Sequence, residues 1–153
     1  MKYEKAPEIE KEARRIIEKL DLKHIDKENI SCIRSYGSKS NAIARCHGLG
    51  KAMQLGLDRK AFYTLEFISE KFDKQDEKDK IKTIIHELLH IPNNFGGGFK
   101  HHNYVNKKRV NKMYKKLKDS DNMDSGDSKI NEINKKGKKE KSWKEKLNFY
   151  YET

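Results

Sequence analysis

The sequence has no long hydrophobic run and little cysteine. Only 34% of its 153 residues are hydrophobic and 39% are charged, so no segment approaches the roughly 18 consecutive apolar residues of a membrane-spanning helix. We therefore expect neither an integral membrane protein nor a membrane partner. The two cysteines, Cys32 and Cys46, are too few for a disulfide framework and lack the close spacing of a thiolate zinc site. Both are expected to be reduced thiols.

We also expect neither a secretory signal nor a second full domain. Residues 1–12 contain four glutamates and no apolar segment of the kind found in signal peptides. Together with reduced thiols, this predicts a cytoplasmic protein. A length of 153 residues allows one domain of ordinary size.

Acidic residues are absent from one stretch of the chain. The formal net charge is +11, and residues 100–118 contain eight basic side chains and no acidic one. Such a segment can attract nucleic acid or an acidic protein, although the abundance of lysine throughout the chain is an alternative explanation. The basic residues of this predicted interface are Lys107, Lys108, Arg109, Lys112, Lys115 and Lys116.

The spacing of apolar residues predicts an α+β domain. Residues 7–20 carry apolar side chains at steps of three and four, which predicts an amphipathic helix that begins near a proline. Residues 30–36 and 42–46 are rich in β-formers and flank a turn-like segment, so they predict a hairpin. In that hairpin the two cysteines are near cross-strand neighbours in the core. Residues 61–68 predict a further strand.

Two more helices are predicted in the second half. Asp76 can cap a helix that buries apolar residues and ends near Ile91, because Pro92 cannot continue it. The glycines at 96–98 then predict a flexible connection, and residues 104–118 predict a final helix with a lysine-covered outer face.

The predicted domain ends at residue 118. Residues 119–140 contain few large apolar side chains, which predicts a disordered linker. Apolar residues return at steps of four and three in residues 141–153, so this end of the chain is a candidate short helix.

The pattern His-Glu-x-x-His lies on the apolar, capped helix. His86 and His90 are four residues apart and project from one side of a helix, so both can bind one zinc ion. Glu87 is then placed to hydrogen-bond a metal-bound water. An amphipathic helix with two surface histidines is the alternative.

A catalytic zinc site needs a third protein ligand. His24 and His47 precede the motif, whereas His101 and His102 follow the glycines, which can return the chain across the helix. The second pair is therefore favoured. No acidic residue occurs in residues 88–118, which argues against a downstream carboxylate ligand.

In these residues the sequence resembles a family of short zincins, the metallopeptidases of archaea and phages with the motif His-Glu-Leu-Leu-His-Ile-Pro, which are distantly similar to SprT-like proteins. The likeness covers about residues 5–117 and includes Arg34-Ser-Tyr-Gly-Ser38 and Ala42-Ile-Ala-Arg-Cys-His-Gly-Leu49. The resemblance implies a minimal gluzincin or SprT-like fold, in which a small sheet packs on the N-terminal and motif helices. It also implies His102 as the third zinc ligand, with His101 as the alternative.

The motif predicts zinc-assisted hydrolysis of a protein or peptide substrate. Zinc lowers the pKa of its bound water to about 7, while Glu87 takes the proton and later protonates the leaving amine. Tyr104, or whichever of His101 and His102 is not a ligand, is a candidate second electrophile. Residues 61–68 are the candidate edge strand for the substrate.

A binding module on a zincin scaffold is the second hypothesis, with recognition of nucleic acid or another partner through the basic helix. Such a module has no need of a carboxylate between the two histidines. Glu87 therefore favours catalysis.

Overall fold

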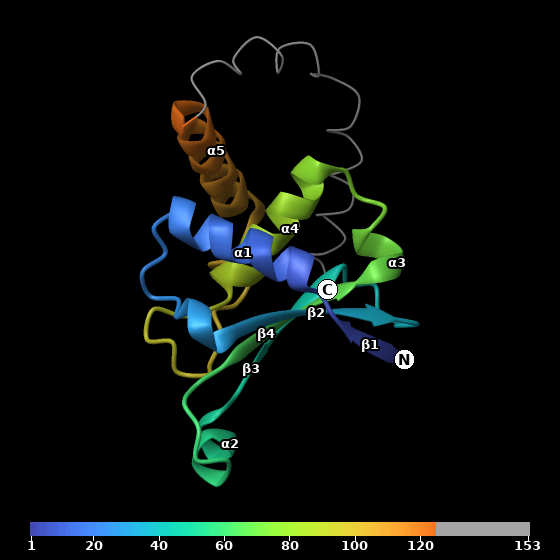
Figure 1. Ribbon diagram of the computed structural model, residues 1–153, viewed down its shortest axis with the longest axis vertical. Coiled ribbons are helices and arrows are strands. Elements are labelled where there is room, and N and C mark those ends of the chain that lie inside the picture. The colour runs from blue at the N-terminus through green and yellow to red at the C-terminus, as the bar shows by residue number, and fades with distance from the viewer. Residues whose placement is uncertain (125–153) are drawn as a thin grey trace.

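A four-stranded sheet with helices on one of its faces forms the architecture (Figure 1). The structure is a computed structural model that describes residues 1–124. The strands are β1 (Lys2–Lys5), β2 (Ile30–Tyr36), β3 (Ala44–Gly48) and β4 (Tyr63–Ile68). The helices are α1 (Pro7–Lys19), the short 3₁₀ helix η1 (Lys27–Asn29), α2 (Lys51–Gly56), α3 (Ser69–Phe72), α4 (Glu77–Leu89) and α5 (Lys107–Asp124). This arrangement confirms the predicted α+β class.

Local sequence explains where the two predicted core helices begin. α1 starts at Pro7, whose fixed φ suits a first helical turn, and it buries apolar residues at steps of three and four. At the start of α4, the Asp76 carboxylate accepts a hydrogen bond of 2.9 Å from the backbone amide of Asp79. The expected cap is therefore confirmed.

The hydrophobic core lies between the sheet and these helices. Tyr63, Leu65 and Phe67 project from one face of β4 and are fully buried. They belong to one apolar cluster with Ile16 of α1 and Leu88 of α4. Burial of such side chains is the main force that holds α4, and with it the histidine motif, against the sheet.

The predicted hairpin is wrong. The strand order is β1-β2-β4-β3, so β4 lies between the two strands that were expected to pair. β4 is parallel to β2 and antiparallel to β3, and both Cys32 and Cys46 pair with Leu65. Almost every residue of β4 is buried, which suits the interior of a sheet. The turn-like segment between β2 and β3 indicated a reversal of the chain but could not identify the neighbouring strand.

The last helix is longer than expected. α5 begins at Lys107 and continues to Asp124, so the first six residues of the predicted linker are helical. Arg15 of α1 binds the carboxylate of Asp121 at 2.9 Å, and Lys19 pairs with Asp124. Two acidic residues of the predicted linker thus form ion pairs with basic residues of α1, which the count of apolar side chains did not reveal. The remaining residues of the predicted linker and the predicted helix at 141–153 lie outside the described residues.

Four short elements were not predicted, namely β1, η1, α2 and α3. All four residues of β1 are exposed, so they lack the alternation of a half-buried strand. α2 and α3 are too short to show a helical period. None of the helices in the described part of the chain combines the length and the apolarity needed to cross a membrane.

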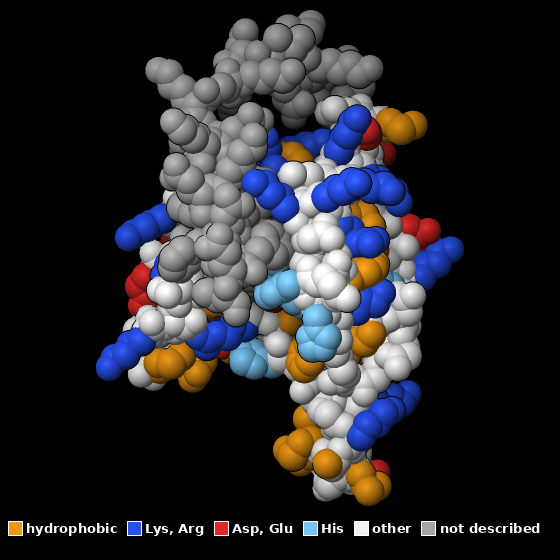
Figure 2. Space-filling model, turned by 180° about the vertical axis from the view of Figure 1, so that it is seen from behind, with side chains coloured by type: hydrophobic (Ala, Val, Ile, Leu, Met, Phe, Trp, Pro, Cys, Tyr) orange, Lys and Arg blue, Asp and Glu red, His pale blue; other side chains and the backbone are white. Residues whose placement is uncertain are grey.

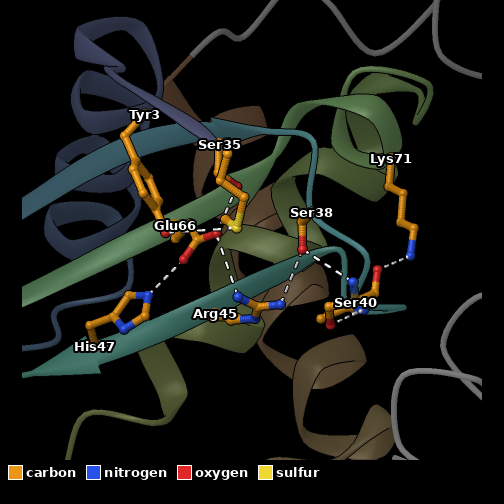
Figure 3. A network of polar contacts seen from close by, with 10 residues as sticks. Tyr3, Ser35, Ser38, Ser40, Arg45, His47, Glu66 and Lys71 are labelled. Carbon is orange, nitrogen blue, oxygen red and sulfur yellow. Dashed lines mark hydrogen bonds and ion pairs between the residues drawn. The ribbon is translucent and has the colours of Figure 1, made fainter.

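The sheet face opposite the core contains a buried carboxylate. Glu66 of β4 is 1% exposed and accepts hydrogen bonds from Ser35 Oγ at 2.6 Å and from His47 Nε2 at 2.7 Å (Figure 3). The Arg45 guanidinium lies 3.7 Å from it. Burial alone would raise the pKa of Glu66, but the hydrogen bonds and the positive charge outweigh it and lower the pKa.

Glu66→Gln is expected to lower the free energy of unfolding at pH 7 by about 1–3 kcal/mol, because the charged acceptor of three side chains is lost. Since the folded-state pKa is lowered, the contribution of Glu66 is present above its unfolded value of 4.5 and disappears as the pH falls through the folded value. Urea unfolding of both proteins should therefore show a difference that shrinks on acidification. An equal difference at pH 7 and at about pH 3 would contradict this assignment.

Candidate metal centre

The histidine motif lies at the buried C-terminal end of α4. His86 and Glu87 are each 1% exposed, and His90 is the residue that caps the helix. The helix ends here because Pro92 follows. The chain then returns across the end of α4 in the segment between α4 and α5.

Three histidines converge at this place. One ring nitrogen each of His86, His90 and His102 lies within 4.8 Å of the others. The Nε2 atoms of His86 and His90 are 3.2 Å apart. The centroid of the His102 ring is 5.5 Å from that of His86 and 5.1 Å from that of His90. Among the described residues, the cluster includes His102 and leaves out the alternative His101.

Hydrogen bonds bring the returning segment to α4. The amide of Lys100 donates to the carbonyl of His90 at 2.8 Å, and His90 Nδ1 lies 2.6 Å from the carbonyl oxygen of Lys100. A carbonyl only accepts, so His90 Nδ1 carries the hydrogen. In the neutral ring, Nε2 is then free of a proton and faces His86. Such a support of the outer nitrogen is typical of metal-binding histidines.

The glycines predicted to be a flexible connection are held by β4. The Tyr63 hydroxyl accepts a hydrogen bond from the amide of Gly97 and donates one to the carbonyl of Gly98, each at 2.8 Å. Gly97 has a φ of +100°, and a Cβ there would lie 2.2 Å from the carbonyl oxygen of Leu49. A residue without a side chain is therefore required where this segment passes the end of β3.

The three clustered histidines are uncharged at neutral pH. Burial lowers the pKa of His86 well below its usual value, and the neighbouring His90 and His102 lower it further. Burial likewise lowers the pKa of His90 and of His102, in each case with a contribution from a nearby histidine. A neutral imidazole has a lone pair for a metal ion, so the cluster is in its ligand form.

The donor set fits a metal ion. Two nitrogens that bind one zinc ion at about 2.0–2.1 Å in tetrahedral geometry are about 3.3 Å apart. The 3.2 Å between the Nε2 atoms of His86 and His90 is close to that separation. His90 Nε2, which carries no hydrogen, thus presents its lone pair at the separation that a shared zinc ion requires.

A pocket of about 590 Å³ opens beside this cluster. Glu87 and His90 line it from α4, Ala44, Arg45 and Cys46 line it from β3, and residues 99–102 complete it. The carboxylate of Glu87 thus reaches the same space as two of the clustered histidines. The contributions of β3, Phe99 and Lys100 were not identified from the sequence, because no spacing rule links β3 to α4.

Tyr104, a candidate electrophile, is not among the residues that line the pocket. The ammonium of Lys100 and the guanidinium of Arg109 lie 3.7 and 3.8 Å from the centroid of its ring. His101, the other candidate, is exposed and does line the pocket. Of these two candidates, His101 is therefore the one that lines the pocket.

The basic residues of α5 have two different surroundings. Lys108, Lys112, Lys115 and Lys116 are exposed, and Figure 2 shows Lys and Arg side chains along this part of the molecule on the face that carries histidines. Arg109 instead donates to the carbonyl of Tyr104 at 2.9 Å, and Lys107 is half-buried. Binding of nucleic acid to this helix stays a prediction.

His102→Ala is expected to weaken zinc binding by at least about tenfold, whereas His101→Ala should leave it within about twofold. Of these two neighbours, His102 places a ring nitrogen in the cluster found among the described residues, and His101 is the chemically matched control. Zinc dissociation constants from competition with a chromophoric chelator would measure both effects. An equal loss of zinc affinity in both variants, or a larger loss in His101→Ala, would show that His102 is not the third zinc ligand.

Comparison with known proteins agrees with this geometry. A family model described as "Putative phage metallopeptidase" matches residues 1–123. Comparisons with curated proteins and with solved structures gave no match. The family match extends from the first strand through nearly all of α5 and includes the three clustered histidines and Glu87. The chain therefore belongs to the family of putative phage metallopeptidases.

Proposed function

We propose that this protein is a zinc-dependent peptidase that cleaves peptide bonds in protein or peptide substrates. The observation that carries the proposal is the convergence of His86, His90 and His102 within 4.8 Å, in contact with a pocket that Glu87 also lines. The proposal includes a minimal zincin fold of the SprT-like type. It also includes a cytoplasmic location, which suits the free thiols of Cys32 and Cys46.

Zinc is the proposed metal because the donor set consists of three neutral imidazoles. Catalytic zinc sites use three protein ligands and keep one position open for water. His86, His90 and His102 would hold the ion. When bound, zinc supplies a Lewis acid that activates water and polarises the carbonyl group.

Glu87 is the proposed general base. Its carboxylate lines the pocket beside His90 and lies 4.0 Å from His86 Nε2, so it can reach a water molecule at the cluster. Glu87 takes the proton of the attacking water and passes it to the nitrogen of the leaving amine. The exposed His101, which lines the same pocket, is the proposed donor of a hydrogen bond to the oxygen of the reacting carbonyl.

β3 is the proposed binding edge for the substrate. Residues 61–68 cannot serve as that edge, because β4 lies in the interior of the sheet. β3 is an outer strand whose free edge pairs with no other strand among the described residues, and its Ala44, Arg45 and Cys46 line the pocket. A substrate added as an extended strand would present its peptide bonds to Glu87.

Removal and return of the metal tests the proposal. Treatment with a strong chelator is expected to lower peptidase activity by at least about 100-fold, and an equimolar amount of Zn²⁺ should restore it. The purified protein should contain about one zinc per chain by elemental analysis. Activity that survives complete removal of metal would contradict the proposed mechanism.

A further inference from the structure

The short helix α2 and the residue after it expose several large apolar side chains. Met53, Leu55 and the following Leu57 are 54%, 85% and 57% exposed, in a chain whose mean hydropathy is -1.08. None of the six residues of α2 is buried. In Figure 1, α2 lies at the far end of the β3 and β4 strands, away from the other helices. A gathered set of exposed apolar side chains on a polar protein indicates a contact surface.

The orientation of α2 is set by polar contacts. Gln54 Nε2 donates to the carbonyl of Leu49 at 2.7 Å and to that of Gly96 at 3.0 Å. Gln54 therefore faces the protein. The same helix is tied to the glycine-containing segment that leads to His102, so its position is linked to that of the metal centre.

The apolar surface of α2 continues toward the pocket. Phe99 lines the pocket, is 42% exposed and lies against Gly48, where a Cβ would come within 3.0 Å of its ring. Gly48 is the last residue of β3, and α2 begins three residues later. Figure 2 shows histidine side chains and, below them, the hydrophobic side chains at this end of the molecule on the same face. The exposed ring of Phe99 thus lies both at the pocket and against the end of β3 that leads to α2.

The direction of β3 decides which part of a substrate would reach α2. β3 runs from Ala44 and Cys46 at the pocket to Gly48 beside α2. A strand that adds to its free edge in the antiparallel sense, which is the slightly more stable pairing, runs from α2 toward the pocket. Residues on the N-terminal side of the cleaved bond therefore pass α2. Gly48 is two residues beyond the pocket-lining Cys46, and α2 begins three residues later, so these substrate residues lie several positions before that bond.

We propose that α2, with Met53, Leu55 and Leu57, is a docking site for an apolar stretch of the substrate on the N-terminal side of the cleaved bond. This inference rests on the proposed peptidase function and adds a preference for the substrate. A second copy of the chain is a poorer occupant, because a six-residue tip cannot supply the roughly 1,200 Å² of buried surface of a stable interface. An extended substrate does not need so large an area at α2 alone, because it also contacts β3 and the pocket.

Profiling of cleavage sites provides the test. The wild-type protein and the Leu55→Ser/Leu57→Ser variant are each incubated with a peptide mixture from a limited digest of a bacterial proteome, and the products are sequenced by mass spectrometry. The wild type should enrich apolar residues several positions before the cleaved bond. The variant should lose that enrichment and keep the preferences next to the bond.

Two peptides chosen from the profile give the size of the effect. They share the residues around the cleaved bond, and one carries an apolar and the other a Ser/Gly extension on its N-terminal side. With the wild type, kcat/KM should be at least about tenfold higher for the apolar peptide than for the Ser/Gly peptide, since burial of one leucine supplies such a factor. This ratio of the two kcat/KM values should approach one in the variant. The unextended peptide should be cleaved equally by both proteins.

Matched controls separate docking from damage to the fold. Met123→Ser removes another exposed apolar side chain, 87% exposed on α5, and should leave the ratio unchanged. Leu55→Ser alone should give an intermediate ratio, with thermal unfolding as in the wild type. Cleavage without apolar enrichment, or enrichment that persists in the double variant, would overturn the docking site alone. A complete lack of cleavage would overturn the proposed function and the docking site with it.

A second copy of the chain or a membrane at α2 would give different results. Sedimentation velocity measures self-association, and co-sedimentation with vesicles of phosphatidylcholine and phosphatidylglycerol measures membrane binding. If the double substitution changes either of these and leaves the peptide ratio unchanged, α2 is not a substrate site.

Discussion

Glu87→Gln is expected to lower kcat for peptide hydrolysis by about 10²–10⁴-fold while the protein still binds zinc. Glutamine has nearly the same shape as glutamate but cannot accept a proton from water. Glu87 is 1% exposed and lines the pocket beside His90, so little water can replace its function. Zinc content and the rate of peptide cleavage, measured on the same preparation, test both parts of this expectation.

Glu77→Gln is the matched control for that variant. Glu77 is on the same helix, in the first turn of α4, and its side chain is 90% exposed. The same chemical change there should leave kcat within about twofold. If Glu87→Gln retained most of the activity, another group would have to transfer the proton, and the central role of this carboxylate would be wrong.

His90→Ala is expected to weaken zinc binding by at least about 100-fold. His90 supplies one of three clustered nitrogens, and loss of mere supporting groups around a metal already costs 10–100-fold in affinity. Wild-type protein should also melt at a higher temperature when zinc is added, because the metal binds the folded state. The variant should show no such rise.

His24→Ala serves as the control for His90→Ala. His24 is also partly buried but does not belong to the cluster found among the described residues. Its substitution should leave the zinc-induced rise in melting temperature intact. Unchanged zinc affinity in His90→Ala would place the metal elsewhere in the molecule.

Features with a local physical cause could be predicted from the sequence. The start of α1 follows from Pro7, and the start of α4 follows from the side chain of Asp76. The relation of His86 to His90 depends only on helical geometry. Local sequence could not show whether His101 or His102 faces α4. In a segment that changes direction, a shift of one residue is enough to turn the other side chain toward the helix.

Features that depend on distant partners were missed. β2 and β3 are consecutive in the sequence, yet each of them pairs with β4, which comes later in the chain, so the central place of β4 depends on non-local contacts. The extension of α5 to Asp124 depends on ion pairs with α1, more than one hundred residues earlier. Glu66 appeared as an ordinary polar residue of a strand, since the three side chains that surround it come from other strands.

The contacts around the returning segment make the site rigid before any ligand arrives. Tyr63 holds Gly97 and Gly98 from the sheet, and Lys100 is bonded to His90 in both directions. None of these hydrogen bonds involves a metal ligand atom of the cluster. We therefore expect loss and recapture of a metal ion to be local exchange events, unlike those of small zinc domains that unfold when their metal is removed. The protein is then expected to fold first and to take up metal afterwards.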